Sequence, residues 1–132
     1  MARGILVKHN GGCIPDVSSF ELAKDTLQQM YDLIGCDLVD YCQIDFEGKR
    51  YDMWFDEEFL VKRNYITFPL CNNGVICGYI AGNVVIMASD KNGECVGLPD
   101  DVIEKMLSSK FFEKKAIEAS EYISEKRLYR LV

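Results

Sequence analysis

Residues 78–94, GYIAGNVVIMASDKNGE, decide the fold. The apolar run predicts a strand at 83–89, and the glycines on either side of it predict turns. The Asn92-Gly93 pair is typical of a two-residue type I′ hairpin turn, with a short return arm at 94–97. The block therefore predicts antiparallel strands, and it contains no group of residues that would carry out a reaction.

Helices are predicted on both sides of this block. After it, Pro99 and two aspartates suit the start of a helix at 99–108. A second helix follows at about 111–127, with one apolar side made of Phe112, Ala116, Ala119 and Ile123. Before it, Ser18 and Glu21 have the spacing of a capping box, and Gly35 suits a helix end. We therefore expect a helix at 19–34.

The remaining segments favour strands. They are a first strand from Gly4 to His9, a hairpin of 37–44 with 50–55 and a strand at 75–81. The segment 57–71 is either an irregular crossing or contains a short strand near 66–70, where Pro69 indicates a sheet edge or a strand end. The order of elements predicts an α+β fold, with a mixed or antiparallel sheet of about 4–6 strands packed against an N-terminal helix and C-terminal helices.

The length of 132 residues predicts one domain, 1–132, with a core at 4–108 and a C-terminal helical extension at 109–132. No apolar run approaches the ~20 residues of a membrane span. Without a recognisable export signal, free thiols in a reducing cytosol are the expected state of the cysteines. These are Cys13, Cys36, Cys42, Cys71, Cys77 and Cys95. We therefore expect a cytoplasmic protein.

The segment 37–58 carries charge equal to the whole net charge of −6. Its acids are Asp37, Asp40, Asp45, Glu47, Asp52, Asp56, Glu57 and Glu58, against Lys49 and Arg50. Such a surface disfavours direct binding to nucleic acid and favours a basic protein surface. In the arm at 50–55 and just beyond it, Asp52, Trp54 and Asp56 share one face. That face is either a site of interaction, with Trp54 as an anchor, or a solvated sheet edge with Trp54 packed under a helix.

Three segments, two of them within the stretch 78–94, carry a resemblance to a known family. They are Ile80-Ala81-Gly82-Asn83-Val84-Val85-Ile86, Asp90 to Glu94, and Leu98 to Ile103. With Leu27 to Gly35 and the acidic strand 51–58, they resemble a family of small proteins carried by phages, plasmids and gut Firmicutes, the domain of unknown function DUF3846. The resemblance spans roughly 4–108. It implies a mobile-element origin and a role in phage–host conflict, and it implies no reaction.

Catalytic and metal-binding patterns are weak. The one histidine, His9, could pair with Cys13, but no third group to orient the histidine is evident. Cys36/Cys42 and Cys71/Cys77 each have five intervening residues, whereas paired cysteine ligands of zinc usually have two to four intervening residues. The carboxylates of 52–58 lack the glycine of a calcium loop. We expect no metal site and no cofactor, and we expect that the protein is not an enzyme.

Three functions remain open. The leading one is a non-enzymatic interaction protein of a phage or mobile element that counters a host defence factor, such as a CRISPR nuclease, through an acidic aromatic face. Its residues would be Asp40, Asp45, Glu47, Asp52, Trp54, Asp56, Glu57 and Glu58. The alternative is a small-ligand module, such as a nucleotide sequestrant, often oligomeric, using Arg63, Asn64, Asn72, Asn73 and Tyr79. The third is a modest enzyme using Cys13 or the carboxylates.

Overall fold

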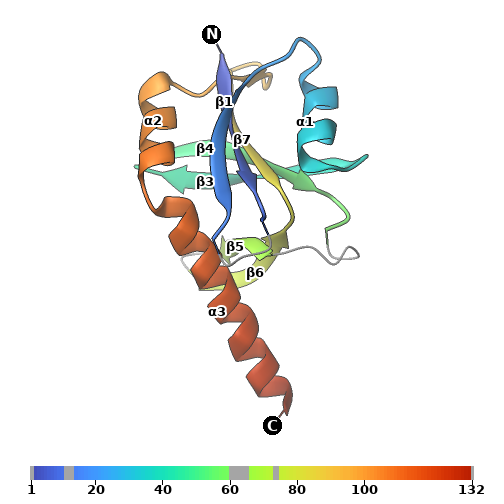
Figure 1. The fold of residues 1–132 in the computed structure, drawn as a ribbon, viewed down its shortest axis with the longest axis vertical. Coiled ribbons are helices and arrows are strands. Elements are labelled where there is room, and N and C mark those ends of the chain that lie inside the picture. The colour runs from blue at the N-terminus through green and yellow to red at the C-terminus, as the bar shows by residue number, and fades with distance from the viewer. Residues whose placement is uncertain (1, 11–13, 60–65, 73–74, 132) are drawn as a thin grey trace.

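A computed structural model describes residues 2–10, 14–59, 66–72 and 75–131, and Figure 1 shows its course. The strands are β1 Arg3–Lys8, β2 Asp16–Glu21, β3 Val39–Phe46, β4 Lys49–Asp56, β5 Ile66–Asn72, β6 Val75–Ala81, β7 Val84–Ser89 and β8 Cys95–Val96. The helices are α1 Thr26–Ile34, α2 Asp100–Ser108 and α3 Phe111–Leu131. The fold is α+β, as predicted.

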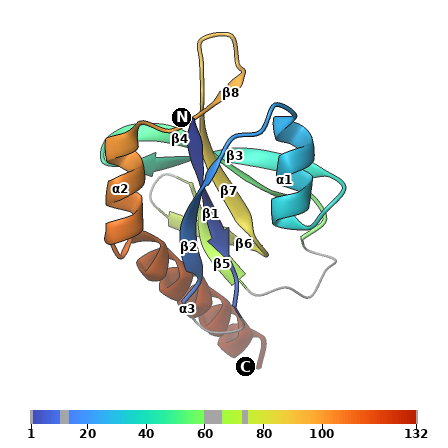
Figure 2. The ribbon, with the colours of Figure 1, turned by 45° about the horizontal axis from the view of Figure 1, so that its top comes forward.

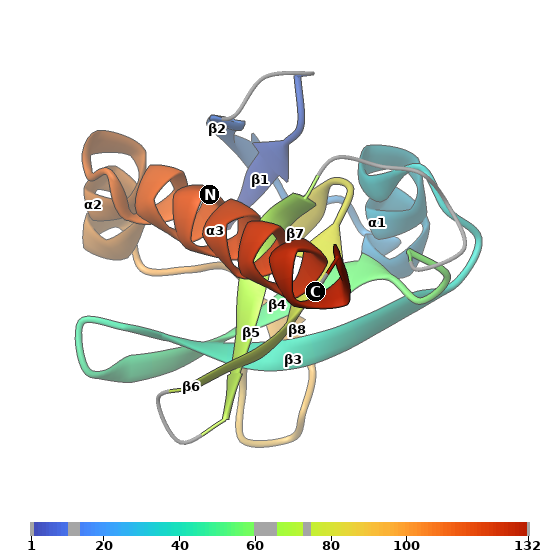
Figure 3. The same ribbon diagram turned by 90° about the horizontal axis from the view of Figure 1, so that it is seen from below.

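One antiparallel sheet has the strand order β2-β1-β7-β4-β3, with β8 paired to β7. Strands β5 and β6 form a separate antiparallel pair. Helices α1 and α2 lie on different sides of the sheet (Figure 2). In this order β3 is an edge strand, and Figure 3 shows it at the outer side of the sheet.

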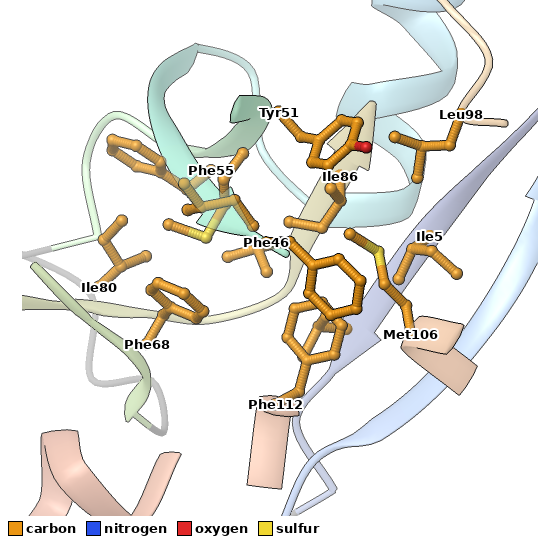
Figure 4. Packing of buried hydrophobic residues seen from close by; sticks show 14 of the residues in the cluster. Ile5, Phe46, Tyr51, Phe55, Phe68, Ile80, Ile86, Leu98, Met106 and Phe112 are labelled. Carbon is orange, nitrogen blue, oxygen red and sulfur yellow. The ribbon is translucent and has the colours of Figure 1, made fainter. Parts of the chain in front are cut away.

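Strand β7 is the centre of the molecule because both of its faces are buried. Val84 and Ile86 belong to the larger core, which α2, α3, β5 and β6 help to form (Figure 4). Val85 and Met87 belong to the smaller core, which lies under α1. A strand covered on both faces reads as a continuous apolar run rather than an alternating one. The run that predicted β7 therefore also records its central place.

The predicted helix at 19–34 is wrong in its first part. Ser18 and Glu21 lie in β2, which pairs with β1 over its whole length, and the helix begins only at Thr26. The helix is capped by Asp25, whose side chain accepts a hydrogen bond from the backbone N–H of Gln28 at 3.0 Å. Pairing with β1 overrides the capping-box pattern, since a sheet edge satisfies every second N–H of the segment. The predicted end at Gly35 is confirmed by its left-handed backbone, φ 81°.

The predicted turn at Asn92-Gly93 is also different in type. Only Gly93 of that pair has a positive φ. The loop has three residues, 91–93, and is closed by a hydrogen bond from the Asp90 N–H to the Glu94 carbonyl. The two-residue turn lies instead between β3 and β4. There Glu47 and Gly48 both have positive φ, 50° and 80°, as a type I′ turn requires.

The predicted C-terminal helices are confirmed, but α3 is more than an extension. Phe112, Ala116 and Ala119 are almost completely buried, and Phe112 is part of the larger core (Figure 4). Helix α3 packs mainly on β5. Because β5 and β6 are not paired with the large sheet, α3 and the larger core hold this pair in place.

Candidate functional site

The predicted acidic face lies on the β3–β4 hairpin, and the structure divides its residues into two groups. Asp40, Asp45, Glu47, Glu57 and Glu58 are exposed. Asp52 and Asp56 are 5% and 3% exposed, so they cannot present their charge to a partner surface. Alternation along β4 placed both on one face, but that face carries the smaller core, which contains residues of α1 and on which Cys95 packs. The prediction that these two belong to the surface is therefore corrected.

The two buried aspartates have local structural settings. The Asp56 side chain accepts a hydrogen bond from the Glu58 N–H at 2.8 Å and shapes the turn that follows β4. Asp52 lies opposite Met87 in the sheet and close to Cys95. Burial, and then the charge of Asp52, raises the pKa of the Cys95 thiol above its ordinary value.

Trp54 is not the exposed anchor of this face. It is half-buried and packs against the smaller core beneath α1. Tyr41, its cross-strand neighbour on β3, covers it with ring centroids 4.7 Å apart and is itself 52% exposed. Sequence reasoning missed Tyr41, although its place opposite Trp54 in the predicted hairpin was a usable signal. The indole N–H of Trp54 is buried and has no hydrogen-bond partner among the described residues.

The carboxylates at the turn end of the hairpin form ion pairs with basic side chains. Asp45 lies 3.4 Å from Arg50, and Glu47 lies 3.0 Å from Lys105 of α2. The hydrogen bond to Glu47, more than any other cause, raises the pKa of Lys105 above its ordinary value. These carboxylates are therefore partly neutralised by cations of the protein itself.

The opposite end of the hairpin is different. We call it the acidic end, and it consists of Asp37, Leu38, Asp40, Tyr41, Glu57 and Glu58. All six are exposed, with Leu38 at 49%. A bond of 3.0 Å from the Glu57 N–H to the Leu38 carbonyl joins its two strands. No cation of the described part of the chain forms an ion pair with its four carboxylates.

A pocket of about 220 Å³ lies beside this hairpin, between β3, β5 and the beginning of α3. Its walls are Cys42, Gln43, Ile44, Asp45, Met53, Phe68, Pro69, Leu70, Phe111 and Lys115. The lining is mostly apolar. The Lys115 ammonium is 3.4 Å from Glu118 and 5.6 Å from the centroid of the Phe111 ring, so its charge is already partnered.

Comparison with protein families matches residues 3–111 to the family described as "Domain of unknown function (DUF3846)". The chain belongs to the DUF3846 family. The matched range includes the whole hairpin, β5 and the start of α3, but not Lys115. No curated protein and no solved structure matches the chain.

The alternative ligand residues of the DUF3846 domain are only partly visible. Arg63, Asn64 and Asn73 lie outside the described residues, and only the backbone of Asn72, in β5, is described. Tyr79 packs against the larger core, and its ring centroid is 6.1 Å from that of Phe59. Tyr79 is not among the residues that line the pocket.

Metal and catalytic candidates in the DUF3846 domain stay apart where they can be placed. Cys36 lies in the smaller core and Cys42 packs on the larger one, so these two thiols are on different sides of the sheet. Cys13 and the side chains of Cys71 and Cys77 lie outside the description. Among the described residues no group of three or more histidine, cysteine or acidic side chains is placed to hold a metal ion. None of the described helices has the length and apolar character to cross a membrane.

Proposed function

We propose that this DUF3846 protein is a non-enzymatic interaction protein whose acidic end binds a basic surface of another protein. One observation carries the proposal. Four carboxylates without ion-pair partners in the described structure lie on the same two adjoining segments as two exposed and largely apolar side chains, Leu38 and Tyr41. Tyrosine is enriched among residues that anchor interfaces, and surrounding acids speed and orient the approach of a basic partner. The paired acids at the turn end lack this combination.

The partner class follows from the charge and from the resemblance to phage-borne proteins. A host defence nuclease presents a basic groove that normally holds phosphates. Exposed carboxylates can occupy such a groove in place of phosphates, and Tyr41 and Leu38 would supply the apolar contact that phosphates lack. We therefore propose that the protein counters a defence factor by covering its nucleic-acid site.

The test is charge reversal at the acidic end. Asp37→Lys, Glu57→Lys and Glu58→Lys together leave Asp40 and the core unchanged. The matched control is Glu94→Lys, Glu104→Lys and Glu121→Lys, which reverses three exposed acids elsewhere and gives the same net charge. Proteins captured from host extract by the wild type would be identified and purified. Their affinities for the three forms would then be measured by calorimetry at two salt concentrations.

We expect the acidic-end variant to bind at least about tenfold more weakly and the control variant to bind like the wild type. Affinity should also fall with added salt, since exposed charges are screened. Equal affinities of the two variants would contradict the proposal.

The small-ligand alternative rests on the pocket. A volume of about 220 Å³ is below the roughly 300–1,000 Å³ of most small-molecule sites, so it suits a side chain better than a whole nucleotide. Thermal-shift screening against nucleotides tests this alternative, because a ligand that binds the folded state raises the melting temperature. A clear rise with any nucleotide would favour it over protein binding.

A further inference from the structure

The outer side of β3 is an open edge. Within the described part of the chain β3 pairs only with β4, and its sequence, VDYCQIDF, contains neither proline nor lysine. Proline and lysine are among the residues that usually protect edge strands from pairing. The edge is therefore able to form main-chain hydrogen bonds with another strand.

The turn determines which residues face this edge. In a two-residue hairpin the pair next to the turn, Phe46 and Lys49, is hydrogen-bonded, and bonded pairs alternate with non-bonded ones. Tyr41, Gln43 and Asp45 therefore direct their N–H and C=O groups away from β4. The Tyr41 N–H shows this directly, because it donates to the Asp40 carboxylate at 2.8 Å. No described residue accepts from the N–H of Gln43 or Asp45.

The pocket lies next to the same stretch of β3. Cys42 and Ile44 face the larger core and form part of its wall, together with Phe68, Leu70 and Phe111. Side chains of a strand added to β3 would alternate between this pocket and the opposite face. On the opposite face they would meet Tyr41 and Gln43, and beyond them Asp45, whose carboxylate is already paired with Arg50 at 3.4 Å.

We propose that a basic partner is bound by strand addition, with one extended segment pairing along Tyr41 to Asp45. Its alternate residues are apolar, one of them filling the pocket, and the intervening residues are lysine or arginine. Main-chain bonds supply affinity and the alternating side chains supply specificity, as in other complexes formed by strand addition. The inference rests on the proposed function, because the acidic end selects the basic segment.

A second copy of this chain is a poorer occupant of the edge. Two β3 strands side by side would bring together two strands that each carry two aspartates, Asp40 and Asp45, and each chain has a net charge of −6. Like charges across paired strands are destabilising. A basic segment meets the same carboxylates with opposite charge.

The test uses a synthetic peptide of nine residues in which lysine and arginine alternate with leucine, phenylalanine and valine. Two further peptides carry N-methyl groups on the odd or on the even residues. N-methylation removes the N–H donors of one edge and keeps the charge and the side chains. The single tryptophan, Trp54, lies under Tyr41 and reports binding by fluorescence.

We expect one methylated peptide to lose at least tenfold in affinity and the other to bind like the parent. Gln43→Pro should lose a similar factor, because proline removes only an outward N–H, whereas Gln43→Ala should bind normally. Hydrogen exchange at the amides of Gln43 and Asp45 should slow in the complex. If Gln43→Pro does not fold, the affinities of the two N-methylated peptides for the wild-type protein still test strand addition.

Two results would overturn strand addition. The first is equal binding of the parent and both methylated peptides, and the second is no binding of the parent peptide at millimolar concentration. In either case the capture experiment with the acidic-end variant still decides the proposed function. A loss of partner affinity in that variant would support binding of a basic partner by the acidic end. Only the proposal that the partner binds as an added strand would then be excluded.

Discussion

At the scale of single residues, Cys42 shows how burial controls chemistry in the pocket wall. Burial, and then the charge of Asp40, raises the pKa of its thiol to about 11 from an ordinary 9.0. At neutral pH the thiol is protonated, and a protonated thiol is a poor nucleophile. Cys42 therefore acts as a small apolar side chain, which agrees with a pocket that receives an apolar group.

The raised pKa predicts a pH dependence of stability. The unfolded chain releases the Cys42 proton near pH 9 and the folded chain near pH 11, so the folded state holds more protons in between. The free energy of unfolding should therefore fall as the pH rises from about 9 to about 11. Cys42→Ala removes this contribution. Urea unfolding of both forms should show the wild type losing more stability across that window, and parallel curves would refute the assignment.

The acidic residues show how far residue identity can be interpreted. The acids do concentrate at 37–58, and alternation correctly set Trp54 on the face of β4 opposite Tyr51 and Met53, which belong to the larger core. It did not show that Asp52 and Asp56 are buried or that Arg50 and Lys105 neutralise the turn end. Lys105 is far from Glu47 in the sequence, so only the folded chain brings the two together.

At the scale of elements, the β3–β4 turn contains a residue poorly suited to its backbone. Glu47 has φ 50°, a conformation that asparagine adopts at lower cost. Glu47→Asn should therefore stabilise the protein by about 0.5–1 kcal/mol in high salt, where the ion pair to Lys105 is screened. The gain should be smaller in low salt, because the substitution also removes that pair.

The control for this prediction is Glu47→Gln, which removes the charge but keeps the unfavourable conformation. Chemical denaturation of both variants at two salt concentrations makes the comparison. An asparagine variant no more stable than the glutamine variant in high salt would contradict the explanation.

The segment 16–21 shows the limit of local patterns for elements. Its capping-box spacing is a genuine helix signal, yet the segment is β2 because β1 offers it a pairing partner. Asp25, the actual cap, is also a residue type that favours helix starts. Two start signals seven residues apart were both compatible with the sequence, and strand pairing selected the second.

At the scale of the whole molecule, α3 packs on β5 and β6 and connects them to the larger core. Phe112 is 1% exposed and belongs to the larger core, so Phe112→Ala should cost about 3–5 kcal/mol. Ile117, on the same helix, is 42% exposed, and Ile117→Ala should cost less than about 1 kcal/mol. Thermal and urea unfolding measure both. Similar losses would show that α3 is not anchored through Phe112.

The sequence by itself determined the α+β class, the strand that forms β7, the acidic hairpin, the helix end at Gly35 and the two C-terminal helices. These features depend on periodicity and on backbone preferences that act over a few residues. Only the tertiary structure decided that β3 is an edge, that a pocket adjoins it and that the unpaired carboxylates gather at one end of the hairpin. Edges, burial and ion pairs depend on which distant elements pack together, and in this chain β7 and α3, far from the hairpin in sequence, make those contacts.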